Sequence, residues 1–175
     1  EILDQILYVE QAVQKRMDSI LFMGMDTHAL SYPAQLTAIE VLAANGVDLY
    51  IAKDFGYTPT PVISHAILTH NAKGGPLCDG IVITPSHNPP TDGGFKYNPP
   101  HGGPADTDVT DWIEARANEI LENGLHDVNK ISVEEALKLQ NVTQYDYVTP
   151  YVDDLENVID MNTIAASGIL IGADA

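Results

Sequence analysis

Residues 84–98 bring together side chains that can take part in group transfer. Ser86 and His87 are adjacent, and Lys96 follows ten residues after the serine. A hydroxyl beside an imidazole, with an ammonium group nearby, is typical of an activated-hydroxyl site. Six of the 11 prolines and four of the 13 glycines lie in residues 85–104. Proline fixes the backbone and glycine lets it approach a ligand, so this stretch is expected to be a stiff loop that holds these groups.

A serine hydrolase is disfavoured as the interpretation of this loop. The chain contains no Gly-x-Ser-x-Gly sequence. In hydrolases the serine occupies such a turn, and its histidine comes from a distant part of the chain. A Ser-His pair in a proline-rich loop also occurs often by chance, so composition alone does not assign catalysis to it.

The elements around the loop predict an α/β domain. Residues 80–84 form the clearest buried strand, and open α/β sheets bind ligands at the carboxyl ends of such strands. Strand and helix patterns alternate along the chain, with a helix N-cap expected at Ser31. Strands are expected at residues 21–23, 47–52, 80–84 and 95–98, and helices at 2–17, 34–44, 61–71, 110–123 and 151–161, with a short one from Ser132. This order predicts a mixed, mostly parallel sheet between helices.

Several other side chains have a functional and a structural interpretation. Asp26 and His28 follow the strand at 21–23, where they would contact the active site or form a cap or turn. Cys78 is expected to be a small core residue rather than a reactive thiol. His65 and His70 lie on one predicted helix and are expected to be packing or surface residues.

Charge and cysteine content exclude some partners. The chain has 25 acidic and 8 basic residues, a formal net charge of −17. Nucleic acid and anionic membrane are therefore not expected as partners, because both would be repelled. No apolar run approaches the roughly 20 residues that cross a bilayer, and a single cysteine favours a reducing cytoplasm.

The end of the sequence predicts the beginning of another domain. Residues 168–172, Gly-Ile-Leu-Ile-Gly, have the pattern of a buried strand that opens a second α/β domain. We expect a first domain at 1–150, then a linker helix and the truncated start of a second domain at 151–175. The chain is therefore expected to be part of a longer protein.

The loop resembles the phosphoserine loop of the α-D-phosphohexomutases. The matching residues are Thr84-Pro-Ser-His-Asn-Pro-Pro90, followed by Gly-Gly-Phe-Lys-Tyr-Asn98. The longer stretch 80–106 is similar to the bacterial phosphoglucomutase branch of that family, as are Gly24-Met-Asp-Thr-His-Ala-Leu30 and Gly56-Tyr-Thr-Pro-Thr-Pro61. Domain 1–150 would then be the phosphoserine-bearing catalytic domain I of such an enzyme.

This resemblance implies a reaction. The phosphorylated Ser86 would interconvert glucose 1-phosphate and glucose 6-phosphate through glucose 1,6-bisphosphate, with Mg²⁺ bound to the phosphoserine oxygen. Lys96 would be an acid/base or charge clamp, and His87 a second acid/base or a phosphate contact. Asn88 would fix the loop by hydrogen bonds. The implied partners are sugar phosphates and the remaining domains of the parent chain.

The same resemblance leaves alternatives and gaps. The family's Asp-x-Asp-x-Asp metal run does not occur in these 175 residues, which are therefore expected to be inactive alone. A phosphomannomutase or phosphoglucosamine mutase would use the same serine on another sugar. A catalytically silent scaffold is the alternative from a different class of protein, and intact Ser86, His87 and Lys96 argue against it.

Overall fold

The computed structural model describes residues 19–174, in which five strands form one sheet. The strand order is β4-β3-β1-β2-β5. β1 pairs in parallel with β2 and β3, β2 pairs in parallel with β5, and β4 is antiparallel to β3. The strands are β1 (Ile20–Met25), β2 (Asp48–Ala52), β3 (Asp79–Ile83), β4 (Phe95–Asn98) and β5 (Val142–Tyr145). The predicted mixed, mostly parallel sheet is confirmed.

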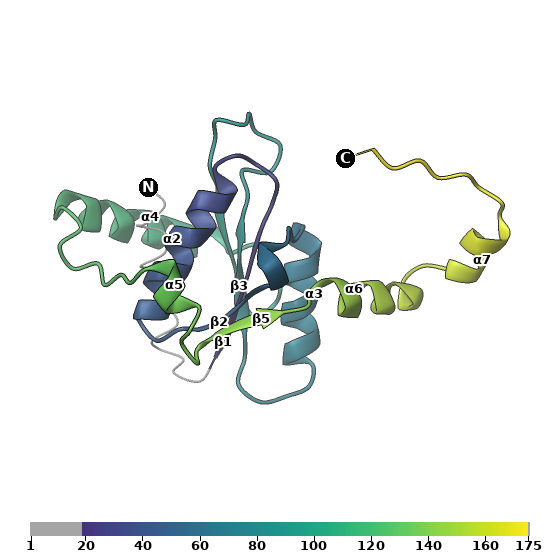
Figure 1. The fold of residues 1–175 in the computed structure, drawn as a ribbon, viewed down its shortest axis with the longest axis horizontal. Helices are drawn as coiled ribbons and strands as arrows, with labels where there is room; N and C mark the ends of the chain where they lie inside the picture. Colours follow the sequence, from purple (N-terminus) through teal and green to yellow (C-terminus); the bar gives the residue numbers. More distant parts are fainter. Residues whose placement is uncertain (1–18, 175) are drawn as a thin grey trace.

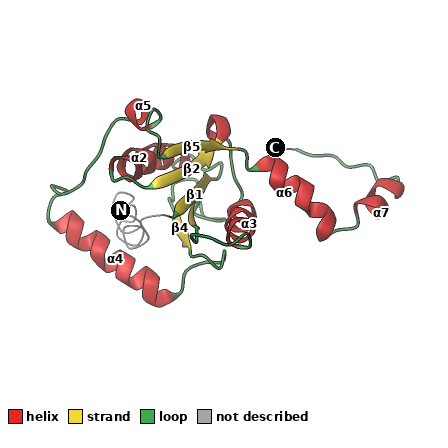
Figure 2. Cartoon of the chain, turned by 90° about the horizontal axis from the view of Figure 1, so that it is seen from below, coloured by secondary structure: helices red, strands yellow, loops and turns green. Residues whose placement is uncertain are grey.

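Helices cover both faces of this sheet, as Figures 1 and 2 show. One core cluster joins alternate residues of β1, such as Leu21 and Met23, to α2, α4 and α5. The other joins Phe22 and Val82 to α3 and to Tyr147. The alternation follows from strand geometry, because successive side chains point to opposite faces. The long helices are α2 (Ser31–Ala44), α3 (Thr60–Asn71) and α4 (Thr107–Glu122); the short ones are α5 (Val133–Ala136), α6 (Val148–Asp154) and α7 (Met161–Ala166), with 3₁₀ turns at Lys53–Phe55 and Leu155–Asn157.

Of two helix starts predicted from the sequence, the structure confirms the one at Ser132 and differs at Ser31. The short helix expected from Ser132 is present, and it begins with a capping box between Ser132 and Glu135. The N-cap expected at Ser31 is wrong, because Leu30 holds that position and Ser31 is already helical. The Ser31 hydroxyl donates instead to Asp26, at 2.6 Å from its Oδ1 atom. A hydrogen bond to a charged carboxylate is stronger than one between neutral groups. The Ser31 hydroxyl therefore bonds to Asp26 and does not cap the helix.

The second half departs further from expectation. Strand β5 was not predicted, since Val-Thr-Gln-Tyr has no apolar run, yet it extends the sheet beside β2. The helix expected at 151–161 is divided into α6, the 3₁₀ turn and α7, whose N-cap is Asp160. On α4, Trp112 is 48% exposed, whereas the adjacent Ile113 is buried.

The buried strand expected at 168–172 does not form. Leu170 is 98% exposed, and none of the residues 19–174 pairs with this segment. A strand is stable only when a neighbour satisfies its backbone and its apolar side chains. Figure 1 shows the segment beyond α7 as an extended trace that turns back from α7 without joining the sheet. The helix expected at 2–17 lies outside the described residues.

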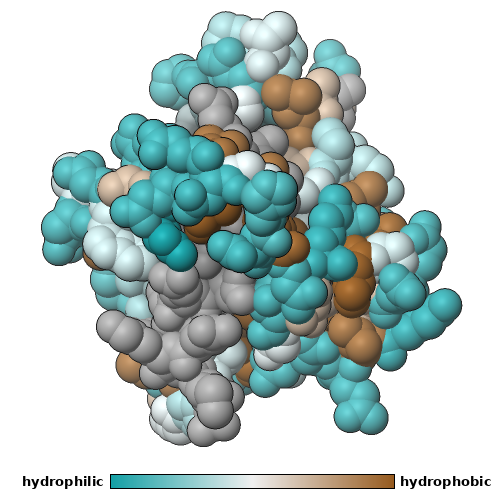
Figure 3. Space-filling view, turned by 90° about the vertical axis from the view of Figure 1, so that its left-hand side faces the viewer, coloured by the Kyte–Doolittle hydropathy of each residue, from teal (hydrophilic) through white to brown (hydrophobic). Residues whose placement is uncertain are grey.

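The side of the molecule in Figure 3 is mainly polar among the described residues. In Figure 3 hydrophilic residues cover much of one side, with apolar patches between them. Within residues 19–174, no helix is both long and apolar enough to span a membrane.

Candidate active site

Ser86 lies in an exposed turn just beyond the carboxyl end of β3. Its φ of 64° is in the left-handed region, which residues other than glycine seldom adopt. The backbone N–H of Ser86 donates to Oγ1 of Thr84 at 2.9 Å, which helps to hold this conformation. Lys96 donates from Nζ to the Ser86 hydroxyl oxygen. The two residues that are ten apart in sequence are therefore in direct contact, with a positive charge beside the hydroxyl.

The β3–β4 pairing brings Lys96 back to Ser86. Lys96 lies opposite Val82 in the antiparallel register. At the base of the loop, the N–H of Thr84 donates to the carbonyl oxygen of Gly94 at 2.9 Å. A Cβ atom at Gly94 would lie 2.1 Å from the Thr84 oxygen, a distance that no side chain tolerates. Gly94 is thus required for the close approach that completes the loop.

A carboxylate at the end of β1 holds the start of the same loop. Oδ1 of Asp26 accepts from the Ser31 hydroxyl and from the N–H of His28, at 2.6 and 3.0 Å. Oδ2 accepts from the Thr84 hydroxyl at 2.5 Å and contacts Nδ1 of His28 at 2.7 Å. Burial opposes ionisation of Asp26, but these hydrogen bonds outweigh it and lower the pKa of the carboxyl.

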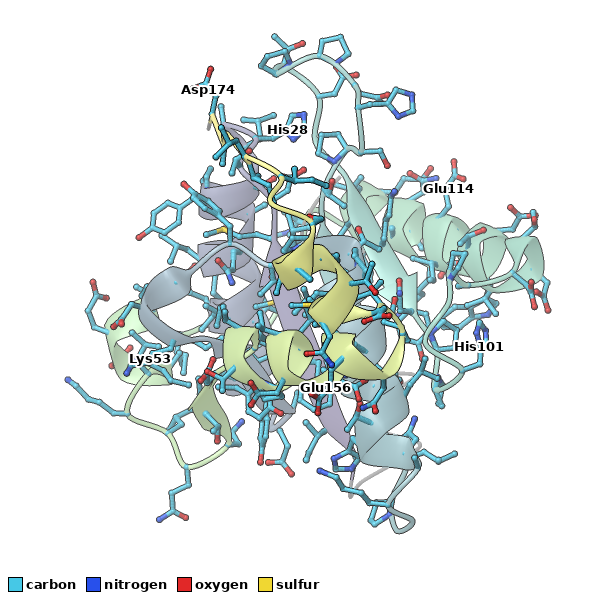
Figure 4. All side chains as sticks on the ribbon, turned by 90° about the vertical axis from the view of Figure 1, so that its right-hand side faces the viewer. His28, Lys53, His101, Glu114, Glu156 and Asp174 are labelled. Atoms are coloured by element: carbon cyan, nitrogen blue, oxygen red, sulfur yellow. The ribbon has the colours of Figure 1, made fainter. Side chains whose placement is uncertain are left out.

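His28 connects this carboxylate to the far side of the turn. Its Nε2 atom lies 3.1 Å from the carbonyl oxygen of Asn88, 60 residues away in sequence. Figure 4 shows His28 beside the loop that projects above the sheet. The hydrogen bond to Asp26 and that to Asn88 both raise the pKa of His28. Asp26 and His28, predicted to lie at the active-site end of β1, contact the serine loop directly.

The other predicted residues are placed differently. His87 is exposed, and within residues 19–174 no hydrogen bond or ion pair joins it to Ser86 or Lys96. Lys96 rather than His87 is thus the partner of the serine hydroxyl. Asn88 contributes its backbone carbonyl to the contact with His28, rather than its side-chain amide. Thr84 was not predicted as a site residue. Its position at the end of the buried strand is the sequence feature that could have indicated its role.

Side chains with a structural interpretation behave as expected. Cys78 is fully buried, and burial raises its pKa to about 12, so it is an inert thiol. His65 lies on α3 and contacts Asp154 at 3.0 Å, while His70 packs edge-on against Phe22. Among residues 19–174, no group of three His, Cys, Asp or Glu side chains is placed to hold a metal ion.

Family comparison links this geometry to known proteins. The profile described as phosphoglucomutase/phosphomannomutase, alpha/beta/alpha domain I, matches residues 6–124. The phosphoglucomutase of Komagataeibacter xylinus is 59% identical over 155 residues, which are 88% of this chain and 28% of that protein. The phosphoglucomutase of Schizosaccharomyces pombe is 35% identical over 69% of this chain and 23% of its own length. The chain thus spans about a quarter of the length of these relatives.

Solved structures share the fold. The open form of parafusin, a phosphoglucomutase from Paramecium, superposes with a TM-score of 0.73 at 22% identity, over 93% of this chain and 32% of that one. A protein from Thermus thermophilus described as a phosphomannomutase gives 0.71 at 22% identity, over 94% of this chain and 33% of its own. Both likenesses concern the sheet and its helices rather than the chemistry.

Proposed function

The chain belongs to the phosphoglucomutase/phosphomannomutase family, and we propose that its protein interconverts glucose 1-phosphate and glucose 6-phosphate through a phosphorylated Ser86. The contact between Lys96 and the Ser86 hydroxyl is the observation that carries this proposal. Because Ser86 is exposed at the end of a strand, a sugar phosphate can approach it. The 59% identity to a phosphoglucomutase favours glucose over mannose or glucosamine as the sugar.

The proposed reaction proceeds in two transfers. In the first, the phosphoryl group leaves Ser86 Oγ for the free 6-hydroxyl of glucose 1-phosphate, giving glucose 1,6-bisphosphate. The Oγ–P bond breaks, the sugar O–P bond forms, and the proton of the sugar hydroxyl passes to the His87 imidazole or to water. After the bisphosphate turns around, its 1-phosphoryl group returns to Ser86 and glucose 6-phosphate leaves. Both steps need in-line positioning and compensation of the oxygen charges.

Lys96 is close enough to the Ser86 oxygen to act on it in both transfers. When the Oγ–P bond breaks, negative charge develops on Oγ, beside the Lys96 ammonium group. That ammonium stabilises the charge or donates a proton to it, and takes the proton back when Ser86 is phosphorylated again. The exposed His87 imidazole is proposed as a second acid/base or phosphate contact, reached only when substrate is bound.

Mg²⁺ is proposed as the cofactor, bound to the phosphate oxygens on Ser86, where it would neutralise charge on the transferred group. The described residues offer Ser86 but no cluster of three further ligands, so the remaining ligands would come from outside residues 19–174. For this reason we also propose that these 175 residues alone have negligible mutase activity. The buried single thiol of Cys78 suits a reducing compartment, and the cytoplasm is the proposed location.

Replacement of the serine tests the proposed function. In the complete protein, Ser86→Ala should lower the conversion of glucose 1-phosphate to glucose 6-phosphate at least about a thousandfold, because the phosphoryl acceptor is lost. Ser167→Ala, which removes an exposed hydroxyl beyond α7, is the matched control and should retain full activity. Unchanged turnover in Ser86→Ala would instead favour a protein that uses this loop only as a scaffold.

A further inference from the structure

The ring of His28 has a hydrogen-bond acceptor at each nitrogen. Nδ1 lies 2.7 Å from Oδ2 of Asp26, and Nε2 lies 3.1 Å from the carbonyl oxygen of Asn88. An ionised carboxylate and a carbonyl oxygen only accept hydrogen bonds, and a neutral imidazole carries a single N–H. Both contacts are hydrogen bonds only when the ring is an imidazolium. In the neutral ring, a nitrogen lone pair would face one of the two oxygens.

These contacts hold the turn on both sides of Ser86. Asn88 follows Ser86 by two residues and is held by His28. Thr84 precedes it by two residues and donates to the same Asp26 oxygen that contacts His28. The Thr84 hydroxyl oxygen also accepts from the Ser86 N–H. A serine at positive φ persists only where its surroundings enforce that conformation, and Asp26 with His28 provides such surroundings.

We propose that His28 is a positioning residue that acts as an imidazolium clamp, holding the Asn88 carbonyl so that the Ser86 hydroxyl stays beside Lys96. When His28 loses its proton, the contact to Asn88 is lost and the turn is released. This inference rests on the proposed role of Ser86 as the phosphoryl acceptor. It adds a residue that acts on the serine through the loop rather than by contact with the reacting atoms.

The charges around His28 favour the clamped state. Asp26, after β1, and Asp92, in the loop before β4, are the charged groups that act on the ring among the described residues. Both are acidic, and both raise the pKa of His28 above its ordinary value of 6.5. The clamp is therefore complete below the ordinary pKa and is lost as the pH rises through the raised one. Ser31 fixes Asp26 itself through a hydrogen bond of 2.6 Å.

Titration of His28 in the complete protein tests the clamp without any need for catalysis. In protein labelled with ¹⁵N-histidine, the His28 signals are those missing from His28→Gln. Both ring nitrogens should be protonated at pH 6, with a pKa above 6.5 that falls in Asp26→Asn. A His28 that titrates at or below 6.5, or that shows a single N–H at pH 6, would overturn the proposal.

The second readout is the rate at which Ser86 acquires a phosphoryl group from glucose 1,6-bisphosphate. This rate is measured by rapid quench and mass spectrometry between pH 6 and 9. The wild-type rate should fall about tenfold or more as His28 loses its proton, because small displacements of a reacting group slow transfer strongly. His28→Gln, which keeps one donor and cannot titrate, should be slower at pH 6 with no such fall. His126→Gln, an exposed histidine after α4, should keep the wild-type profile.

The two readouts separate the clamp from the proposed function. If wild-type Ser86 takes up no phosphoryl group, the proposed function fails. The histidine titration still decides whether His28 is an imidazolium that forms a hydrogen bond at each ring nitrogen. If Ser86 is phosphorylated but His28→Gln keeps the wild-type rate and pH profile, the proposed function stands and the clamp is overturned.

Discussion

Lys96 differs from Lys130 and Arg116 because its ammonium group contacts a hydroxyl and not a carboxylate. Lys130 pairs with Glu40 at 2.8 Å, and Arg116 pairs with Glu119 at 2.7 Å, both at the surface. Such exposed pairs contribute little to stability. The ammonium group of Lys96 lies next to the Ser86 oxygen, so its positive charge would be adjacent to an oxygen anion or a phosphate at that position. We therefore expect Lys96 to act in transfer more than in folding.

Replacement of Lys96 measures that contribution. Lys96→Gln keeps a donor group and loses the charge, so phosphoryl transfer to Ser86 should slow at least about a hundredfold. Lys96→Arg keeps the charge in a different geometry and should lie between Lys96→Gln and wild type. The measurements are the transfer rate and the urea midpoint, with the exposed Lys73→Gln as control. A transfer rate unchanged in Lys96→Gln, or a lower urea midpoint without slower transfer, would contradict this role.

At the scale of elements, the loop between β3 and β4 depends on a backbone contact that a side chain would prevent. The Gly94 carbonyl accepts from Thr84 at 2.9 Å, and a Cβ atom at residue 94 would lie 2.1 Å from the Thr84 oxygen. Because the clashing atom belongs to the backbone of the adjoining strand end, it cannot move without opening the base of the loop. The strain would therefore reach Ser86 and Lys96 together.

Gly94→Ala should destabilise the protein by about 1–3 kcal/mol, as overpacking of a close contact does, and should slow phosphoryl transfer more than this loss of stability explains. Gly172→Ala is the control, since a Cβ atom there meets nothing within 4 Å. Urea unfolding and the transfer rate are measured on both variants. If Gly94→Ala has the stability and rate of Gly172→Ala, the close approach at Thr84 is not what holds the loop.

The sequence predicted four of the five strands and the three long helices of the described residues, because their apolar spacing matches a strand or a helix. Strand β5 was missed, since its sequence contains no apolar run and the strand forms only by pairing with β2. In the site, the spacing of Ser86 and Lys96 was recognised in advance through the family resemblance. The link from His28 to Asn88 was not predictable, because it depends on the parallel register that sets Met25 beside Ile83.

At the scale of the whole molecule, negative charge is the dominant surface property. The net charge is −17, and 15 of the 25 acidic residues lie in 101–175 with only 3 of the 8 basic ones. Side chains of like charge repel one another across the folded surface more than in the expanded unfolded chain. Cations such as Lys96 are therefore local exceptions on an acidic protein.

Salt should for this reason stabilise the protein at pH 7. The urea midpoint is expected to rise between about 20 mM and 500 mM NaCl, because the Debye length shortens and the repulsion is screened. Salt also weakens the attraction within surface ion pairs, which lowers the urea midpoint, but this effect is smaller. A midpoint that falls with salt would mean that attractive pairs, and not repulsion, dominate the electrostatics of the fold.

The phosphorylation state of Ser86 tests the central claim most directly. The tryptic peptide Gly74–Lys96 is analysed by mass spectrometry, using the complete protein incubated with glucose 1,6-bisphosphate and Mg²⁺ and then with excess glucose 1-phosphate. The account predicts a phosphoryl group on Ser86 that appears with the bisphosphate and is lost to the monophosphate. A peptide that remains unmodified under both conditions would contradict it, since Ser86 would then not be a phosphoryl acceptor.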